Sequence, residues 1–547
     1  MSFFAEAGGL GTNFGPFDTL IVVAYLSVSL VIGLVVRRFV SDMTTYIAAG
    51  RSVGRWLGLA SLTGTELGLI TVMYSAEKGF KGGFAAFHIA VIAGIVTFLV
   101  GATGFIIVPL RRHQVLTIPE YYGCRFGRRT QILGGLMLAL GGILNMGLFL
   151  KVGSMFIVGV TGMSKHGWAL PVVMTSLLAL VLVYTVLGGM ISVIITDYIQ
   201  FVILAFGMLA ATGLSIVWLG WDTIFSTVEA VKGEAGFDPF SESGVFGADY
   251  VMWMTFLGIV SCAIWPTSVA RALAMEDEAA VRSSYRWSSI SFTIRFLLPY
   301  FWGICALVFF MTKAPDLAER FGLGEGGANS TETAMNALYA MPIYLGKLLP
   351  TGLLGLVVAA MIAAFMSTHD SYLLCWASVI VQDIVAPLRQ REFTATQRVM
   401  ATRIVIVLIG IWIWAWGLFY EGGDDIWDYM AITGAIYFTG AFAVLVGGLY
   451  WRSGSSAGAF GALLAGCTAV FGLKPIRIPL GQSILSAMGR PSGVEEAEAF
   501  LTSQRVGLAA VLLTLAVFVL LSLCLPDRDE AAASVAGGGR RGEGVVG

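Results

Sequence analysis

About thirteen apolar runs, each long enough to cross a bilayer as a helix, account for most of the chain. They lie at 17–38, 55–75, 84–110, 131–158, 168–187, 190–219, 248–272, 285–312, 350–380, 399–419, 429–450, 456–473 and 505–525. Of the 547 residues, 57% are hydrophobic and only 12% are charged, whereas a soluble protein carries about 25% charged residues. Each run has the length that a helix needs to cross about 30 Å of hydrocarbon, so an all-α integral membrane protein is predicted.

The rest of the composition excludes several classes of protein. The net charge of -1 gives no reason to expect a nucleic-acid partner, and no obligate protein partner is evident. The six cysteines form no paired spacing, which argues against a zinc site or a disulfide framework. The N-terminal residues lack the basic start of a cleavable signal peptide. The Ala/Gly/Arg-rich tail after Pro526 is expected to be disordered.

Arginine and lysine concentrate in alternate loops, which predicts the orientation in the membrane. The arginine-rich connections contain Arg37, Arg38, Arg51 and Arg55; Arg111, Arg112, Arg125, Arg128 and Arg129; Arg271, Arg282 and Arg286; and Arg389, Arg391 and Arg398. The remaining loops carry fewer positive charges for their length. We therefore expect a multi-pass protein of the plasma membrane, with its N-terminus outside and its C-terminus in the cytoplasm.

Two of the apolar runs contain features that interrupt a helix. The run 55–75 carries Glu66 between Gly64 and Gly68, and the run 248–272 carries Pro266. A lone carboxylate at membrane depth is costly, and unwound backbone is tolerated there only beside a protein-lined cavity. The two runs are five apart, so two inverted repeats would place their breaks at corresponding positions. That arrangement indicates a transporter site.

Polar side chains also lie inside three other runs. Asp197 follows Thr196 in the run 190–219, and Arg295 lies about ten residues into the run 285–312. The run 350–380 carries Ser367, Thr368, Asp370 and Ser371 on adjoining helical positions. Hydroxyls, a carboxylate and carbonyls freed by an unwound segment are the ligands that a hard cation prefers.

These residues belong to motifs that resemble the sodium:solute symporter family, which includes bacterial proline and galactose symporters and mammalian glucose cotransporters. The resemblance runs from about Thr45 to Trp451. Its most specific element is YTVLGGMIS at 184–192, followed by TDYIQ at 196–200. Further matching segments are TTYIAAGRS at 44–52, LTIPEYYGCRFGRR at 116–129, AAFMSTHDSYLL at 363–374 and GGLYWR at 447–452.

The resemblance implies a LeuT-like fold of five plus five helices in inverted repeats, with discontinuous first and sixth core helices. The implied parts are an extra N-terminal helix in 1–45, a first repeat in 46–220, a second repeat in 247–452, two extra helices in 453–526 and a disordered tail in 527–547.

The resemblance also implies where sodium binds. The main site would use the carbonyls of Gly64, Leu67 and Ala364 and the hydroxyls of Ser367 and Thr368. A second sodium or a proton would bind at Asp197, Asp370 and Ser371. Asp370 departs from the family pattern, which usually has a small residue at that position.

The expected solute site lies between the two breaks. Its candidate residues are Glu66, Thr71, Arg295, Ser261, Trp265 and Thr433. In an apolar surround Glu66 and Arg295 are expected to pair when the site is empty. A buried arginine can bind a carboxylate bidentately, although sugar hydroxyls would also be satisfied there. Ser261 stands where the sugar symporters carry a tyrosine, which argues against a standard sugar site.

The function predicted from these features is sodium-coupled symport of a small polar organic solute, an amino acid, organic acid or sugar, by alternating access. The predicted partners are that solute, a sodium ion and the lipid bilayer. The alternatives are a proton-coupled transporter on the same fold and a solute-binding membrane sensor. No nucleophile–base set is evident in the sequence, so an enzyme is not expected.

Overall fold

The computed structural model describes residues 11–36, 51–163, 166–241, 244–318, 321, 323, 331–389, 392–419 and 426–527. Within these ranges the chain is helical, and its one β-type pairing is an isolated bridge between Val53 and Met275. The predicted all-α class is therefore confirmed. Thr45, most of the motif at 44–52 and the expected disordered tail beyond Asp527 lie outside the described residues.

In chain order the elements are α2 (Pro16–Val36), α4 (Arg55–Glu66), α5 (Leu69–Gly82), η3 (Gly83–Ala86), α6 (Phe87–Thr103), α7 (Ile107–Arg112), α8 (Ile118–Phe126), α9 (Arg128–Val160), α10 (Ala169–Leu219), α11 (Trp221–Lys232), η5 (Gly233–Gly236), α12 (Ala248–Ala263), α13 (Pro266–Ala274), α14 (Glu278–Thr312), α15 (Pro315–Ala318), α16 (Thr331–Leu348), α17 (Leu353–Val379), the π-helical η7 (Ile380–Val385), α18 (Ala386–Leu388), α19 (Ala395–Phe419), α20 (Ile426–Tyr450), α21 (Ser456–Gly466), η8 (Cys467–Gly472), α22 (Lys474–Ala487), α23 (Val494–Phe500) and α24 (Ser503–Cys524).

Nine stretches of the described residues are long and apolar enough to cross a membrane, or ten if a pair bent by 83° at Leu473 counts as one span. Two shorter apolar helices, Pro16–Ser29 and Ala169–Val183, lie in other predicted runs. The count of thirteen spans therefore stays a prediction. Large apolar side chains such as Val217, Leu512 and Ile411 are exposed on the helices, as lipid-facing residues should be.

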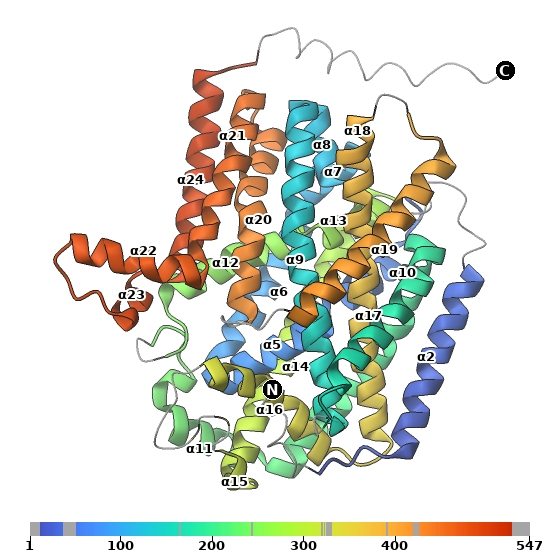
Figure 1. The fold of residues 1–547 in the computed structure, drawn as a ribbon, viewed down its shortest axis with the longest axis vertical. Coiled ribbons are helices and arrows are strands. Elements are labelled where there is room, and N and C mark those ends of the chain that lie inside the picture. The colour runs from blue at the N-terminus through green and yellow to red at the C-terminus, as the bar shows by residue number, and fades with distance from the viewer. Residues whose placement is uncertain are drawn as a thin grey trace.

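Both interrupted runs are broken in the structure. The helix α4 ends at Glu66 and α5 begins at Leu69, whereas α12 ends at Ala263 and α13 begins at Pro266. Proline is tolerated at the first position of a helix because it lacks the backbone N–H that a helix start leaves unpaired. Figure 1 shows α20, α21 and α24 grouped at one edge of the molecule and α2 at the opposite edge.

Close backbone packing holds α14 against α5. A Cβ added at Gly303 would lie 1.9 Å from the carbonyl oxygen of Ala76, and one added at Gly79 would lie 2.1 Å from that of Tyr300. Only glycine fits at such contacts, because any side chain would push the two helices apart. This packing brings Arg295, two turns earlier on α14, to the end of α4.

Several of the arginine-rich connections meet at one end of the molecule. Arg111 donates to the carbonyl of Met275 at 3.0 Å, and Arg282 donates to that of Ala102 at 2.9 Å. Arg125 donates to the carbonyl of Arg452 at 2.9 Å. These connections therefore lie on the same side of the helical bundle, as the distribution of charge predicted.

Candidate functional site

The broken end of α4 presents backbone carbonyls to α17. The last carbonyls of a helix have no partner within it, so a buried end needs other donors. The hydroxyl of Ser367 donates to the carbonyl of Gly64 at 3.0 Å, and that of Thr368 donates to the carbonyl of Thr65 at 3.3 Å. Side chains more than 300 positions away in the chain therefore complete the end of this helix.

The same two hydroxyls are shared with a carbonyl of their own helix. Ser367 and Thr368 also donate to the carbonyl of Ala364, at 3.1 Å and 3.0 Å. The oxygens expected to hold sodium at Gly64, Ala364, Ser367 and Thr368 are thus joined by hydrogen bonds. Leu67 lies in the break itself, with φ -93° and ψ 67°.

Gly68 lets α17 approach the break. A Cβ at Gly68 would lie 2.4 Å from the hydroxyl oxygen of Thr368, so a larger residue would separate the two segments. Neutral oxygens at such a crossing suit a hard cation without redox chemistry. Among the described residues, no group of three or more His, Cys, Asp or Glu side chains could hold a metal ion in the manner of zinc or iron.

Glu66 is buried at the end of α4 and faces the beginning of α13. Its Oε1 atom accepts hydrogen bonds from the hydroxyls of Thr267 at 2.9 Å and Ser268 at 2.6 Å. Both hydroxyls lie in the first turn of α13, where the helix dipole favours a negative charge. The break before Pro266 therefore provides the environment that holds the Glu66 carboxylate.

Arg295 pairs with Glu66, as the sequence analysis expected. Its Nη1 atom donates to the backbone carbonyl of Glu66 at 2.9 Å and to Oε2 at 3.2 Å. The guanidinium lies over the rings of Phe292 and Phe296, at 3.8 Å and 4.6 Å from their centroids. Arg295 is only 3% exposed, so this ion pair is shielded from water.

A cavity lies beside this ion pair, with about 710 Å³ of non-protein space when the solvent at its mouth is included. Five of the predicted solute-site residues line it, namely Glu66, Thr71, Ser261, Trp265 and Arg295. Thr433 does not line it, but its hydroxyl donates at 2.7 Å to Asn145, which does.

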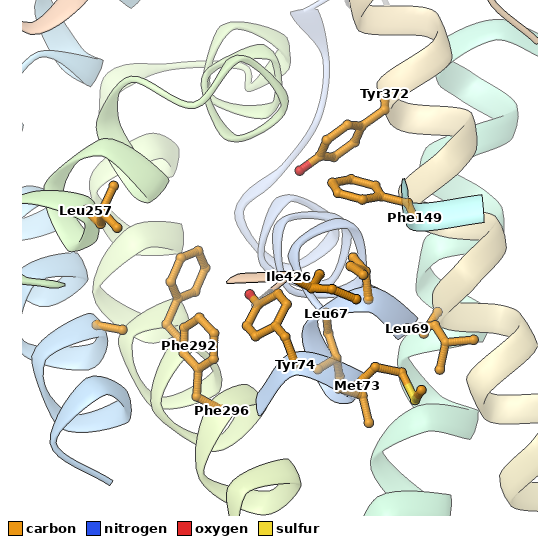
Figure 2. Packing of buried hydrophobic residues seen from close by; sticks show 14 of the residues in the cluster. Leu67, Leu69, Met73, Tyr74, Phe149, Leu257, Phe292, Phe296, Tyr372 and Ile426 are labelled. Atoms are coloured by element: carbon orange, nitrogen blue, oxygen red, sulfur yellow. The ribbon is translucent and has the colours of Figure 1, made fainter. Parts of the chain in front are cut away.

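Seven of the twenty residues that line the cavity are aromatic. Figure 2 shows Tyr74 and Phe296 on one side, and Phe149 and Tyr372 projecting from α9 and α17 on another. The Nε1 atom of Trp265 donates to the hydroxyl of Tyr372 at 2.6 Å. The wall therefore offers broad apolar faces, with its charge confined to Glu66 and Arg295.

Asp197 lies in a second buried polar cluster, together with the side chain of Arg271. The Asp197 Oδ2 atom accepts hydrogen bonds from Ser61 at 2.8 Å and from Thr65 at 3.0 Å, and lies 3.3 Å from Nη2 of Arg271. The same guanidinium donates to the hydroxyl of Ser371. Ser371 in turn donates to Asp370 at 3.1 Å.

The assignment of Arg271 to a cytoplasmic loop was wrong. Arg271 lies on α13 and is only 2% exposed, because the half-helix after Pro266 carries it back into the bundle. The three sites predicted separately are also connected. Thr65, one residue before Glu66, bonds to both Asp197 and Thr368.

Five residues at the site were not predicted from the sequence to belong to it, namely Thr267, Ser268, Arg271, Ser61 and Asn145. A signal for three of them was present, since Thr267, Ser268 and Arg271 follow a broken helix at spacings that share one face. Ser61 and Asn145 lie in ordinary apolar runs, and only the tertiary contacts identify them.

Comparisons with known proteins identify the family of this chain. A family model described as the sodium:solute symporter family matches residues 46–466. The sodium/glucose cotransporter of Vibrio parahaemolyticus is 24% identical over 493 residues, covering 86% of this chain and 87% of that protein. The sodium/myo-inositol cotransporter 2 of Mus musculus is 26% identical over 484 residues, covering 82% and 69%.

A solved structure has the same fold. It is the substrate-bound, outward-open state of a Na+-coupled sialic acid symporter, with a TM-score of 0.74 and 18% identity. The match covers 94% of this chain and 99% of that one. At this identity the likeness establishes the fold and leaves the solute open.

Proposed function

The chain belongs to the sodium:solute symporter family, and we propose that the crossing of the α4–α5 break with α17 binds the sodium ion that it transports. The protein is a multi-pass membrane transporter that couples a small solute to sodium, and not an enzyme. The observation that carries the proposal is the set of hydrogen bonds by which Ser367 and Thr368 complete the end of α4.

Sodium would be held by the carbonyls of Gly64, Leu67 and Ala364 and the hydroxyls of Ser367 and Thr368. In their present geometry, the two hydroxyls donate to carbonyl oxygens beside them. A hydroxyl that ligates a cation through its oxygen turns its proton away. Binding would thus exchange hydrogen bonds between α4 and α17 for ion–oxygen contacts that join the same two helices.

The solute would occupy the cavity beside this crossing. We assign Glu66, Thr71, Arg295, Ser261 and Trp265 to direct contact, and Thr433 to an indirect role through Asn145. Two of the relatives are named for glucose and myo-inositol, and the structural neighbour is named for sialic acid. We propose that the solute of this protein is an amino acid, an organic acid or a sugar.

The second sodium or proton predicted from the sequence would bind at Asp197, Asp370 and Ser371, where the side chain of Arg271 also lies. Arg271 puts a positive charge at 3.3 Å from the Asp197 carboxylate, where a second sodium would otherwise compensate the buried charge. We infer that Arg271 takes that role at Asp197. Coupling would then rely on the single sodium at the α4–α17 crossing.

We infer that sodium and solute are coupled through the break that they share, so that the two move together in alternating access. Sodium bound to the end of α4 would order Leu67 and Gly68, which follow Glu66 directly and end three residues before Thr71. The solute contacts those same residues, so each ligand raises the affinity for the other by the same factor. The membrane potential adds about 2.3 kcal/mol per charge per 100 mV to inward movement.

We also propose that the end carrying Arg111, Arg125 and Arg282 faces the cytoplasm, with the N-terminus outside. The N-terminal segment supports this, because Thr12 and Asn13 bond to the carbonyls of Val160 and Gly346 rather than to any of the arginine-rich connections.

The orientation predicts which cysteines a membrane-impermeant maleimide reaches. In a variant with Cys467 and Cys524 changed to serine, the exposed Cys124 should be labelled only after the cells are permeabilised. Desolvation and the Glu120 carboxylate raise the pKa of the Cys124 thiol, so labelling should be faster at alkaline pH, where more thiolate is present. A Glu234→Cys variant on the same background should be labelled in intact cells. The reverse pattern would invert the orientation.

The sodium site predicts the effect of removing each hydroxyl. Ser367→Ala and Thr368→Ala should raise the sodium concentration needed for half-maximal uptake by on the order of tenfold or more, because each deletes an ion ligand. Ser378→Ala is the matched control, since Ser378 lies on the same helix, is buried and donates only to the carbonyl of Leu374. Unchanged sodium activation in both site variants would refute the assignment.

The role of Arg271 predicts the shape of the sodium dependence. Uptake should rise hyperbolically with sodium concentration in the wild-type protein, because a single ion binds. A sigmoidal curve that becomes hyperbolic in Asp370→Asn would instead show that a second sodium binds in the Asp197 cluster, and would contradict the inference.

A further inference from the structure

Resting on the proposed function, we propose that the transported solute carries a carboxylate, which binds to the Nε–Nη2 edge of Arg295. Some hydrogen-bond donors around the cavity are already used within the protein, whereas those on one edge of Arg295 are available to a ligand.

Arg295 has unused donors on one edge of its guanidinium. Every hydrogen bond that it makes to the described residues leaves from Nη1, and both go to Glu66. Its Nε atom is buried and has no partner among those residues. The N–H groups of Nε and Nη2 form a planar fork that matches the two oxygens of a carboxylate. A buried donor without a partner is costly, so a ligand that pairs with it gains that free energy.

The aliphatic hydroxyls of the cavity are committed within the protein. Thr65 donates to Asp197, Ser261 to the carbonyl of Gly258, and Thr368 to that of Ala364, all at 3.0 Å. Thr71 points to the carbonyl of Glu66 at 3.5 Å. Each hydroxyl has a single proton to donate. Among the charged and aliphatic hydroxyl side chains of the lining, the donors available to a solute therefore lie on Arg295.

Glu66 leaves the arginine free to take a second partner. Its Oε1 atom is held by Thr267 and Ser268, and its charge lies at the N-terminal end of α13. Only Oε2 of the carboxylate depends on Arg295. A solute carboxylate can therefore share the guanidinium with Glu66. Glu66 accepts from Nη1, and the solute would accept from Nε and Nη2.

The charge balance explains why such a solute needs sodium. Glu66 and Arg295 cancel each other, so a bound carboxylate leaves an excess negative charge in a buried site. Sodium at the α4–α17 crossing, one residue from Glu66, supplies the compensating positive charge. An α-amino acid would bring its own ammonium group as well, and the aromatic wall suits an apolar or aromatic body.

The test uses purified protein in detergent, with and without sodium, and a panel of matched probes. The probes are 3-phenylpropionate, L-phenylalanine, acetate, phenethylamine, D-glucose and myo-inositol. Carboxylate probes should raise the unfolding temperature in sodium, whereas phenethylamine and the two polyols should not. Comparing 3-phenylpropionate with L-phenylalanine shows whether the ammonium group contributes. Stabilisation by a polyol more than by any carboxylate, or by no carboxylate at all, would overturn the proposal.

Arg295→Lys tests the fork itself, because lysine keeps the charge but cannot present two parallel N–H groups. The variant should lose on the order of 10- to 100-fold in affinity for the carboxylate that stabilises the wild-type protein best. Its stabilisation by sodium alone should persist, which shows that it is folded. Arg286→Lys, an exposed position on the same helix, is the matched control and should bind as the wild type does. Wild-type carboxylate affinity in Arg295→Lys would refute the assignment.

Uptake into proteoliposomes tests the carboxylate proposal separately from the proposed sodium-coupled symport. Sodium-driven uptake of a polyol, without carboxylate binding, would support the symport function and refute the proposal that the solute carries a carboxylate. Carboxylate binding at Arg295 without any sodium-dependent accumulation would support a carboxylate ligand and refute sodium coupling through this site.

Discussion

The unsatisfied carbonyls at the end of α4 are the constraint on which the site depends. A helix that stops inside a membrane protein must find donors for its last carbonyl groups, because no water is available in hydrocarbon. Ser367 and Thr368 of α17 meet this need for Gly64 and Thr65, and Arg295 of α14 meets it for Glu66. Three helices are therefore fixed around one break, and the same polar groups become available to an ion and a solute.

Glu66 and Asp197 each face a buried arginine. Glu66 faces Arg295 and the start of α13, and Asp197 faces Arg271 from that same half-helix. The break before Pro266 thus serves both clusters, and Thr65 links the Asp197 cluster to α17. Because removal of one partner would leave a buried charge uncompensated, the clusters are expected to respond as a unit when a cation or an anion arrives.

Much of the candidate site could be predicted from the sequence because several of its residues are unusual within an apolar membrane-spanning run. A carboxylate between two glycines, an arginine deep in an apolar run and a proline at a matching position are each costly in lipid, so each marks a site. The contacts between these residues could be inferred from the sequence only in part. Arg271 looked like a loop charge because its burial depends on the direction of α13 after the break, which no local pattern encodes. Asn145 and Ser61 lie among apolar neighbours and become visible only through contacts more than 130 positions apart.

The central claim is that sodium and solute are coupled because they share the break between α4 and α5. The most direct test is a titration of sodium into the purified protein with and without saturating solute, together with the converse titration. Each ligand should lower the dissociation constant of the other by the same factor, on the order of 5- to 150-fold. A sodium dissociation constant that is unchanged by the solute would show that the two sites are independent, and would contradict the claim.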